Sequence, residues 1–278
     1  MLLAGWPVLA ATILIDDDSG QRLTLERPPQ RIISLSPHLT ELLFAVGAGS
    51  QIVGVDSASD YPAAARYLPR VGDFSRIRLE RILALKPDLI VAWSGGNRAA
   101  DLHGIARLGI PVLRTEAVRL DDVSRLLKLL GTATGHPEAG SKAAQTYQTE
   151  LSGLKRRYAK KTLLPVFYQI WDRPLMTVGG QHWISEALRV CGARNLFDDL
   201  DSVAPVVSRE AVLLRMPGLI AGSIESADMQ DHWQSFSQLP AVRKRAFIQV
   251  DSDRLHRATP RLINGVAHLC EALAPYQR

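Results

Sequence analysis

The sequence predicts an α/β fold in which two Rossmann-like lobes are joined by a single long interdomain helix. Three observations support this prediction. Apolar strands alternate with helices along the chain, a twelve-residue motif occurs twice, and a long helical pattern separates its two copies. The chain has 278 residues, and this length suits two lobes of about 130 residues each better than one small domain.

The elements expected before the long helix alternate in type. Arg31–Ser36 is a short, apolar, β-branched run typical of a buried parallel strand. Ser36 and Pro37 predict a helix over 37–46, because serine caps helices and proline fits the first turn. The further expected elements are strands 52–55, 88–93 and 111–114 and helices 79–85, 98–108 and 121–135. This alternation predicts a mainly parallel sheet.

A long helical pattern occupies residues 137–160. Tyr147, Leu151, Leu154 and Tyr158 recur there at spacings of three and four, which gives one apolar stripe. A helix of about 24 residues is roughly 36 Å long, which is enough to join two lobes. The alternation then resumes with strands 166–170, 219–222 and 246–250 and helices 183–190, 209–215 and 260–273.

The chain contains an internal repeat. Residues 79–90 match residues 209–220, with Glu, Leu, Pro, Leu and Ile at equivalent places 130 positions apart, and a weaker echo pairs 41–48 with 186–193. Because the carboxyl ends of parallel strands share one edge of a sheet, we expect a ligand site between two related lobes. The predicted domains are an N-terminal signal remnant and strand over 1–24, a first lobe over 25–136, the interdomain helix over 137–160 and a second lobe over 161–278.

Composition and motifs argue against several classes of function. Hydrophobic residues make up 46% and charged residues 22% of a chain with a net charge of +5, but both signs are interspersed, so we expect no nucleic-acid partner. The chain has no nucleophile elbow, zinc-protease motif or phosphate loop, so we assign no catalytic residue. None of the seven histidines pair at positions i and i+4, and we predict no metal site. A meeting of His38 and His182 as metal ligands is the alternative.

The N-terminal end and the two cysteines bear on the cellular compartment. Residues 1–11 are apolar and end in small residues, which is typical of a signal-peptide remnant, and the alternative is an apolar first strand. Cys191 and Cys270 are either two buried thiols of a cytosolic protein or one disulfide of a secreted protein. No other segment approaches 18 consecutive apolar residues, so we predict no transmembrane span.

Aromatic residues and glycines concentrate in the loops that follow predicted strands. Aromatic faces suit a large flat ligand and glycines allow a close backbone approach, although these aromatics would equally suit the lobe cores. Glu80 and Glu210 begin the two repeat helices, where they either complement the helix dipole or dock onto arginines of a symmetric partner. The loop residues are Tyr61, Phe74, Trp93, Gly95, Gly96, Asn97 and Trp171.

Over residues 25–275 the chain resembles the periplasmic binding proteins of iron-siderophore and cobalamin ABC importers. The segments that carry the resemblance are RIISLSPHLTE at 31–41, SDYP at 59–62, LERI at 79–82, KPDL at 86–89, VSRE at 207–210 and RATPR at 257–261. The Trp93-x-Gly95-Gly96-Asn97 loop, with Asp253 and Arg257, resembles the cobalamin-binding members of this family.

This resemblance implies a helical-backbone periplasmic-binding-protein fold, a periplasmic location and a non-catalytic role without a cofactor. The implied ligand is a corrinoid of the cobalamin type that the lobes capture and deliver to the permease of an ABC importer. The resemblance implies a disulfide between Cys191 and Cys270. The implied permease contacts are Glu80 and Glu210. The implied ligand contacts are Phe74, Trp93, Trp171, Asp253 and Arg257, to which the loop pattern adds Tyr61, Gly95, Gly96 and Asn97.

Two positions depart from the pattern of the cobalamin-binding members. Ala58 stands near the SDYP turn where an aromatic residue is expected, and Ala204 stands before Pro205 where a tryptophan is expected. The exact ligand therefore stays open, and a ferric siderophore or haem is the alternative for the same fold. A second alternative, an enzyme with a metal cluster between its lobes, would require cysteines from both lobes at the ligand site.

Overall fold

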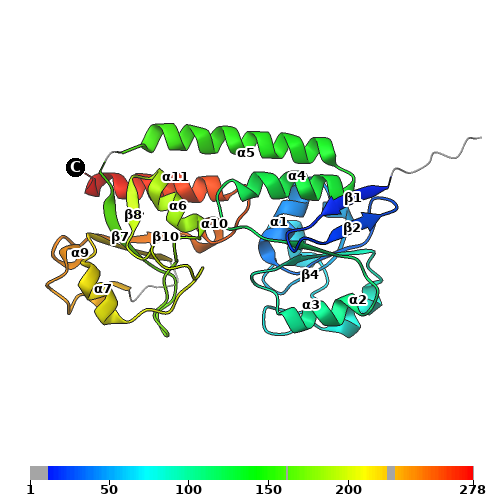
Figure 1. The fold of residues 1–278 in the computed structure, drawn as a ribbon, viewed down its shortest axis with the longest axis horizontal. Helices are drawn as coiled ribbons and strands as arrows, with labels where there is room; N and C mark the ends of the chain where they lie inside the picture. Colours follow the sequence, from blue (N-terminus) through cyan, green and yellow to red (C-terminus); the bar gives the residue numbers. More distant parts are fainter. Residues whose placement is uncertain (1–11, 161, 224–228, 278) are drawn as a thin grey trace, which may run out of the picture. The chain divides into compact units, whose positions relative to one another are not determined.

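The computed structural model describes residues 12–160, 162–223 and 229–277 (Figure 1). These residues form two compact units. One unit contains the chain up to Glu116 together with Arg125–Ala144, and the other contains Ala117–Ser124 together with the chain from Gln145 onward. The suggested signal remnant, residues 1–11, lies outside the described residues. The domain boundaries at 24, 136 and 160 stay a prediction.

Each unit contains a four-stranded parallel sheet with the same strand order. In the first sheet the order is β4-β3-β5-β6, and in the second it is β8-β7-β9-β10. The first strand of each parallel sheet thus lies between the second and the third, which is the result expected for a duplicated βα unit. The strands are β3 (Ile32–Ser34), β4 (Ile52–Val55), β5 (Leu89–Trp93), β6 (Val112–Thr115), β7 (Leu164–Gln169), β8 (Ala193–Asn195), β9 (Leu219–Ser223) and β10 (Phe247–Val250).

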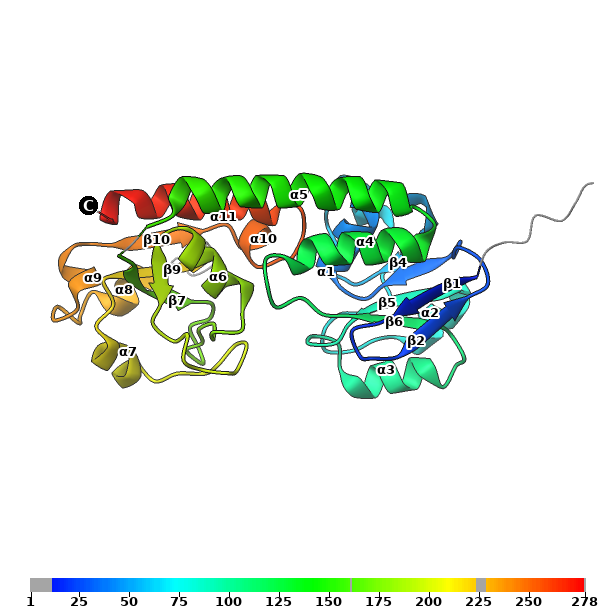
Figure 2. The same cartoon turned by 45° about the horizontal axis from the view of Figure 1, so that its top comes forward.

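The helices follow the predicted alternation with the sheet strands. The longest, α5, covers Pro137–Tyr158 and runs alongside α4 in both views (Figures 1 and 2). The others are α1 (Pro37–Ala45), α2 (Leu79–Leu85), α3 (Ala99–Ala106), α4 (Asp122–Thr134), α6 (Trp183–Val190), α7 (Arg209–Arg215), α8 (Met229–Trp233), α9 (Pro240–Arg243), α10 (Ser252–Leu255) and α11 (Leu262–Leu273). Short 3-10 turns cover η1 (Gly49–Gln51), η2 (Ala63–Tyr67) and η3 (Ala274–Tyr276).

The repeat motif has the same backbone geometry in both units. Both α2 and α7 are seven residues long. Each ends at a residue in the left-handed region, Lys86 with φ 47° and Met216 with φ 50°. A proline follows each of them, and it prevents the helix from continuing. The strands β5 and β9 then begin at equivalent positions, so the internal repeat predicted from the sequence is confirmed in detail.

The first unit buries its apolar side chains on both sides of its sheet. One cluster lies under α2 and α3 and includes Ile33, Ile90 and Ile105, each fully buried. The helices α4 and α5 cross closely at Gly131 and Gly140. A Cβ atom added to Gly131 would lie only 2.8 Å from the Cα atom of Gly140, so glycine permits this approach. A two-stranded antiparallel hairpin, β1 (Ile13–Asp16) with β2 (Arg22–Leu25), precedes the sheet. The sequence had indicated only one strand in this segment.

Several short elements of the structure are not predicted by the sequence patterns. The strand β8 has three residues and α8, α9 and α10 have four or five, which is too short for a periodic pattern. One local expectation was wrong. Ser36 occupies the N-cap position of α1, but its side chain makes no capping hydrogen bond. Instead, the Ser36 hydroxyl lies 2.8 Å from Nδ1 of His38.

The two cysteines form a disulfide. Cys191 at the end of α6 is joined to Cys270 in α11, so the disulfide alternative is confirmed and the free-thiol alternative is wrong. The bond ties the C-terminal end of α6 to α11 within the second unit. Among the residues that the structure describes, no helix combines the length and the apolar character needed to cross a membrane.

Candidate functional site

The loop after β5 holds Trp93 through contacts within the loop and with the residue after β3. The backbone N–H of Trp93 donates to Oδ1 of Asn97 at 2.8 Å, and Nδ2 of Asn97 donates to the carbonyl of Leu35 at 2.9 Å. A Cβ atom on Gly96 would lie 2.0 Å from Cε3 of Trp93. Glycine is therefore required there so that the indole can pack against the loop backbone. This loop brings together four of the predicted ligand-site residues.

Two side chains from neighbouring strand ends contact the Trp93 indole. Its Nε1–H donates to Oε1 of Glu116, which follows β6, at 2.8 Å. The ring of His38, which follows β3, meets the indole edge to face, with centroids 5.2 Å apart and planes at 89°. Neither residue was assigned to the ligand site in the sequence, although His38 lies in the RIISLSPHLTE segment. Only the order of strands in the folded sheet places Glu116 and His38 beside β5.

Tyr61 and Phe74 lie on two further loops of the first unit, both between β4 and α2. Arg70 donates to the carbonyls of Asp56 at 3.0 Å and Ser59 at 2.6 Å and so holds the loop before Tyr61. Tyr61 itself is 45% exposed. We use the name first aromatic face for Tyr61 and Phe74, which lie between β4 and α2, and Trp93, the last residue of β5.

A short turn presents Phe74 to solvent. Oδ1 of Asp73 accepts hydrogen bonds from the N–H of Ser75 at 2.8 Å, from its hydroxyl at 2.6 Å and from the N–H of Arg76 at 3.1 Å. These bonds, led by the one from the Ser75 hydroxyl, hold the pKa of Asp73 below its usual value. The turn leaves Phe74 83% exposed. A phenyl ring presented in this way offers apolar surface to a ligand.

In the second unit, Trp171 stands at a tight turn after β7. The turn is closed by backbone hydrogen bonds between Ile170 and Met176 and between Trp171 and Met176. The indole N–H donates to the carbonyl of Arg173 at 3.1 Å, and the side chain is 56% exposed. Trp171 therefore exposes its apolar ring, and its one polar group, the indole N–H, already has an acceptor within the turn.

Asp253 and Arg257 form an ion pair in the segment after β10. Nη2 of Arg257 lies 2.8 Å from Oδ1 of Asp253; the side chains are 17% and 53% exposed, respectively. The structure thus brings these two predicted residues together. Trp171 lies on a separate loop, since β9 stands between β7 and β10 in the sheet. We use the name second face for the three ligand contacts predicted in this unit, Trp171, Asp253 and Arg257.

Hydrogen bonds from buried side chains hold the Asp253–Arg257 segment at His256 and Leu255. The hydroxyl of Tyr168 lies 2.8 Å from Nε2 of His256, and the indole N–H of Trp183 donates to the carbonyl of Leu255 at 2.9 Å. Burial raises the pKa of Tyr168 far above its usual value, so its hydroxyl keeps its proton in this contact with His256. His182 caps α6 by accepting from the N–H of Ile184 at 3.0 Å.

Two neutral histidines beside this segment predict a pH-dependent stability. Burial, and secondarily the charge of His256, lowers the pKa of His182 to about 3. Burial lowers the pKa of His256 to about 4, against the opposing effect of Asp251 and Asp253. Both values lie below the usual 6.5, so the unfolded chain binds more protons than the folded chain as the pH falls from 6.5 toward 4. We expect the free energy of unfolding to be roughly 2–4 kcal/mol lower at pH 5 than at pH 7.

Urea unfolding at pH 7 and pH 5 measures this effect. His182→Asn keeps an acceptor for the Ile184 N–H and removes one titrating ring, so it should lose about half of the pH dependence. The exposed His103 offers a matched control, and His103→Gln should retain all of it. Equal stability of the unaltered protein at both pH values would contradict the assignment.

Glu80 and Glu210 occupy equivalent places in the first turns of α2 and α7. Both are exposed. Hydrogen bonds from its own backbone N–H and from Ser208 lower the pKa of Glu210, so this side chain is ionised at neutral pH. Each helix therefore presents one exposed carboxylate at its N-terminus.

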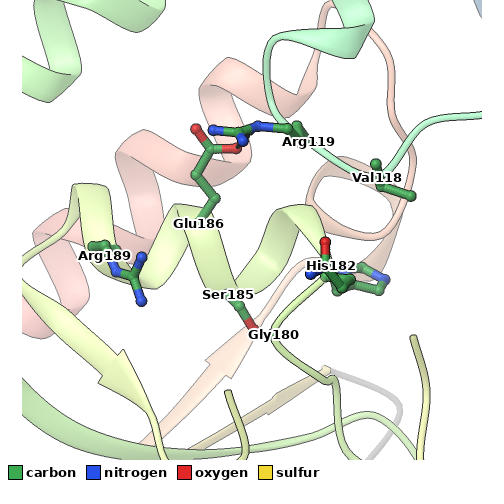
Figure 3. Close-up of a pocket in the computed structure, with 8 residues that line it drawn as sticks. Val118, Arg119, Gly180, His182, Ser185, Glu186 and Arg189 are labelled. Carbon is green, nitrogen blue, oxygen red and sulfur yellow. Dashed lines mark ion pairs between the residues drawn. The ribbon is translucent and has the colours of Figure 1, made fainter. Parts of the chain in front are cut away.

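A separate small cavity of about 220 Å³ lies at the start of α6 in the second unit (Figure 3). Arg119 and Glu186, whose charged groups lie 4.0 Å apart, line it together with His182. It is smaller than the 300–1,000 Å³ typical of ligand pockets, and no predicted ligand-site residue lines it. Within the described parts of the chain, no group of three or more His, Cys, Asp and Glu side chains is placed to hold a metal ion.

Comparison with known proteins identifies the family. A model of the family described as Periplasmic binding protein matches residues 32–254. The chain is 39% identical over 254 residues to the vitamin B12-binding protein of Pectobacterium atrosepticum, covering 88% of this chain and 89% of that protein. It is 37% identical over 254 residues to the vitamin B12-binding protein of Vibrio cholerae serotype O1, covering 90% and 91%.

Solved structures give the same result. The periplasmic vitamin B12 binding protein BtuF of Vibrio cholerae matches with a TM-score of 0.84 at 36% identity, covering 90% of this chain and 99% of that chain. The apo form of the periplasmic heme-binding protein RhuT from Roseiflexus sp. RS-1 matches with a TM-score of 0.79 at 25% identity, again over 90% and 99%. The fold class, the periplasmic location and the non-catalytic role predicted from the sequence agree with these matches. The chain belongs to the periplasmic binding protein family.

Proposed function

We propose that this chain captures vitamin B12, or a closely related corrinoid, and delivers it to the permease of an ABC importer. The observation that carries the proposal is the presence of an exposed aromatic side chain on a loop of each unit, Phe74 before α2 and Trp171 after β7. The identity of 35–39% to vitamin B12-binding proteins over about nine tenths of the chain supports the choice of ligand.

The chemistry of the two faces suits a corrinoid. The macrocycle is large and flat, so that the rings of the first aromatic face and of Trp171 can cover it and remove apolar surface from water. Amide groups surround the rim of a corrinoid. The Asp253 carboxylate can accept hydrogen bonds from them, and the Arg257 guanidinium can donate to them. We therefore assign the first aromatic face and the second face to ligand contact.

We assign Glu80 and Glu210 to the permease. Two equivalent carboxylates on two related units match a partner that presents the same basic site twice, as a symmetric dimer does. Carboxylates pair well with arginine, which binds them through two parallel hydrogen bonds. Neither glutamate belongs to the two faces assigned to the ligand, so docking and ligand capture are separable functions in this proposal.

Native mass spectrometry of the purified protein tests the choice of ligand. The protein is incubated with an equimolar mixture of cyanocobalamin, haem and a ferric hydroxamate. We expect one adduct, with the mass of a single cyanocobalamin. A haem or hydroxamate adduct without cyanocobalamin would refute the corrinoid assignment and leave a binding protein of the same family with another ligand.

Haem is the second candidate ligand. Ala58 and Ala204 stand where the resemblance implies aromatic side chains, and Tyr61 offers an exposed phenol of the kind that ligates haem iron. A haem complex would show a shifted Soret band, and Tyr61→Phe would change that band if the phenol ligates the iron. With cyanocobalamin, Tyr61→Phe should leave the absorption spectrum of the bound ligand unchanged.

A further inference from the structure

The Trp93 indole is held on three sides by groups of its own unit. Its Nε1–H donates to Oε1 of Glu116 at 2.8 Å. The His38 ring packs against it at 5.2 Å. The backbone of Gly96 lies so close to the benzo ring that a Cβ atom would clash. A tryptophan side chain in an open loop samples several rotamers, whereas these contacts favour one orientation.

Asn97 fixes the backbone on which this indole stands. Its Oδ1 accepts from the Trp93 N–H at 2.8 Å and its Nδ2 donates to the Leu35 carbonyl at 2.9 Å. The side-chain amide thus ties the start of the loop after β5 to the end of β3. Both ends of this amide are used within the chain, which favours a role in shaping the loop over a direct contact with ligand.

Gly95, like Gly96, leaves room for the groups around the indole. A Cβ atom there would lie 2.8 Å from Oε2 of Glu116 and 3.1 Å from Nε1 of Trp93. A side chain at position 95 would therefore push the carboxylate away from the indole. The Trp-x-Gly-Gly-Asn pattern consequently encodes one aromatic contact residue and three residues that shape its surroundings.

We propose that Glu116 and Asn97 are positioning residues, which act on the ligand only through Trp93. This inference rests on the proposed function, in which Trp93 contacts the corrinoid. Glu116 fixes the ring through the indole N–H and Asn97 fixes the loop backbone. Because the ring is ordered before the ligand arrives, binding does not have to immobilise it, and the affinity is higher.

A double-mutant cycle on the dissociation constant for cyanocobalamin tests the role of Glu116. We expect Glu116→Ala to weaken binding about five- to tenfold in the unaltered background, because the indole loses its acceptor. In a Trp93→Phe background the ring has no N–H that could donate to Glu116. There we expect Glu116→Ala to weaken binding less than about twofold. Equal factors in the two backgrounds would overturn the proposal, since Glu116 would then act independently of Trp93.

Two further variants complete the cycle. Glu116→Gln keeps an acceptor for the indole N–H, and we expect it to restore most of the affinity lost in Glu116→Ala. The exposed Glu26 of the same unit provides a matched control, and Glu26→Ala should bind like the unaltered protein. A loss in Glu116→Gln as large as in Glu116→Ala would overturn the proposal, because Gln keeps the acceptor for the indole N–H.

A ligand-free measurement separates this inference from the proposed function. In a protein labelled with ¹⁵N, the indole N–H resonance of Trp93, assigned with Trp93→Phe, should be shifted downfield and protected from exchange. We expect Glu116→Ala to move it and Asn97→Ala to broaden or move it, both without ligand. An unchanged resonance in both variants would overturn the positioning role. Absence of cyanocobalamin binding by the unaltered protein would instead refute the proposed ligand.

Discussion

If Glu80 and Glu210 dock onto the permease as proposed, loss of both is expected to impair uptake strongly while leaving ligand capture intact. In the variant Glu80→Ala with Glu210→Ala, we expect uptake of labelled cyanocobalamin to fall more than about tenfold, because each lost carboxylate leaves a charged group of the permease unpaired, and about 1.4 kcal/mol suffices for a tenfold loss. The dissociation constant for cyanocobalamin should stay within about twofold of the unaltered value, since both side chains lie outside the two faces. Uptake is measured in cells that carry the variant in place of the original protein.

Matched controls exist on α5. Glu138 and Glu150 are exposed, and Glu138 lies in the first turn of its helix as the docking glutamates do. Glu138→Ala with Glu150→Ala removes the same charge and should leave uptake unchanged. Each single variant, Glu80→Ala or Glu210→Ala, should give an intermediate loss. Full uptake by the Glu80/Glu210 double variant would exclude these residues from docking.

Removal of the disulfide is expected to cause the largest loss of stability. Cys191 and Cys270 are 79 positions apart. Closing a loop of that length lowers the entropy of the unfolded chain by an amount equivalent to roughly 4 kcal/mol. Both side chains are also fully buried, so Cys191→Ala with Cys270→Ala leaves small voids that add to the loss. We expect the free energy of unfolding in urea to fall by about 4 kcal/mol.

Reduction provides the control for this second prediction. A reductant should destabilise the unaltered protein by a similar amount and should have no effect on the double alanine variant. The dependence of the unfolding free energy on urea should also become steeper without the disulfide, because the unfolded chain then exposes more surface. An unchanged unfolding midpoint in the reduced protein would contradict the entropic account.

The features that the sequence predicts well are those with a local signal. The helices α2 and α7 have the predicted bounds, since a proline ends each of them and the repeat supports both. The strands β5 and β9 are continuous apolar runs, which is typical of parallel strands buried on both sides. The loops at Trp93 and Trp171 were recognised because each adjoins the end of an apolar strand, and the loop at Phe74 because it precedes a repeat helix.

The contacts around Trp93 could not be predicted from spacing. His38 lies at the start of α1 after β3, Trp93 at the end of β5 and Glu116 directly after β6, and only the strand order of the folded sheet makes them neighbours. Asn97 was assigned to the ligand from its place in the loop pattern. The hydrogen bonds of its amide to Trp93 and Leu35 appear only once the end of β3 is placed beside the loop.

A calorimetric titration of the purified protein with cyanocobalamin tests the central claim most directly, with haem and a ferric hydroxamate titrated in parallel. The account predicts tight binding of cyanocobalamin with one site per chain and no measurable heat from the other two ligands. Binding of haem or the hydroxamate, with none of cyanocobalamin, would contradict the corrinoid assignment. It would show that the replacement of the expected aromatic residues by Ala58 and Ala204 accompanies a different ligand specificity on the same fold.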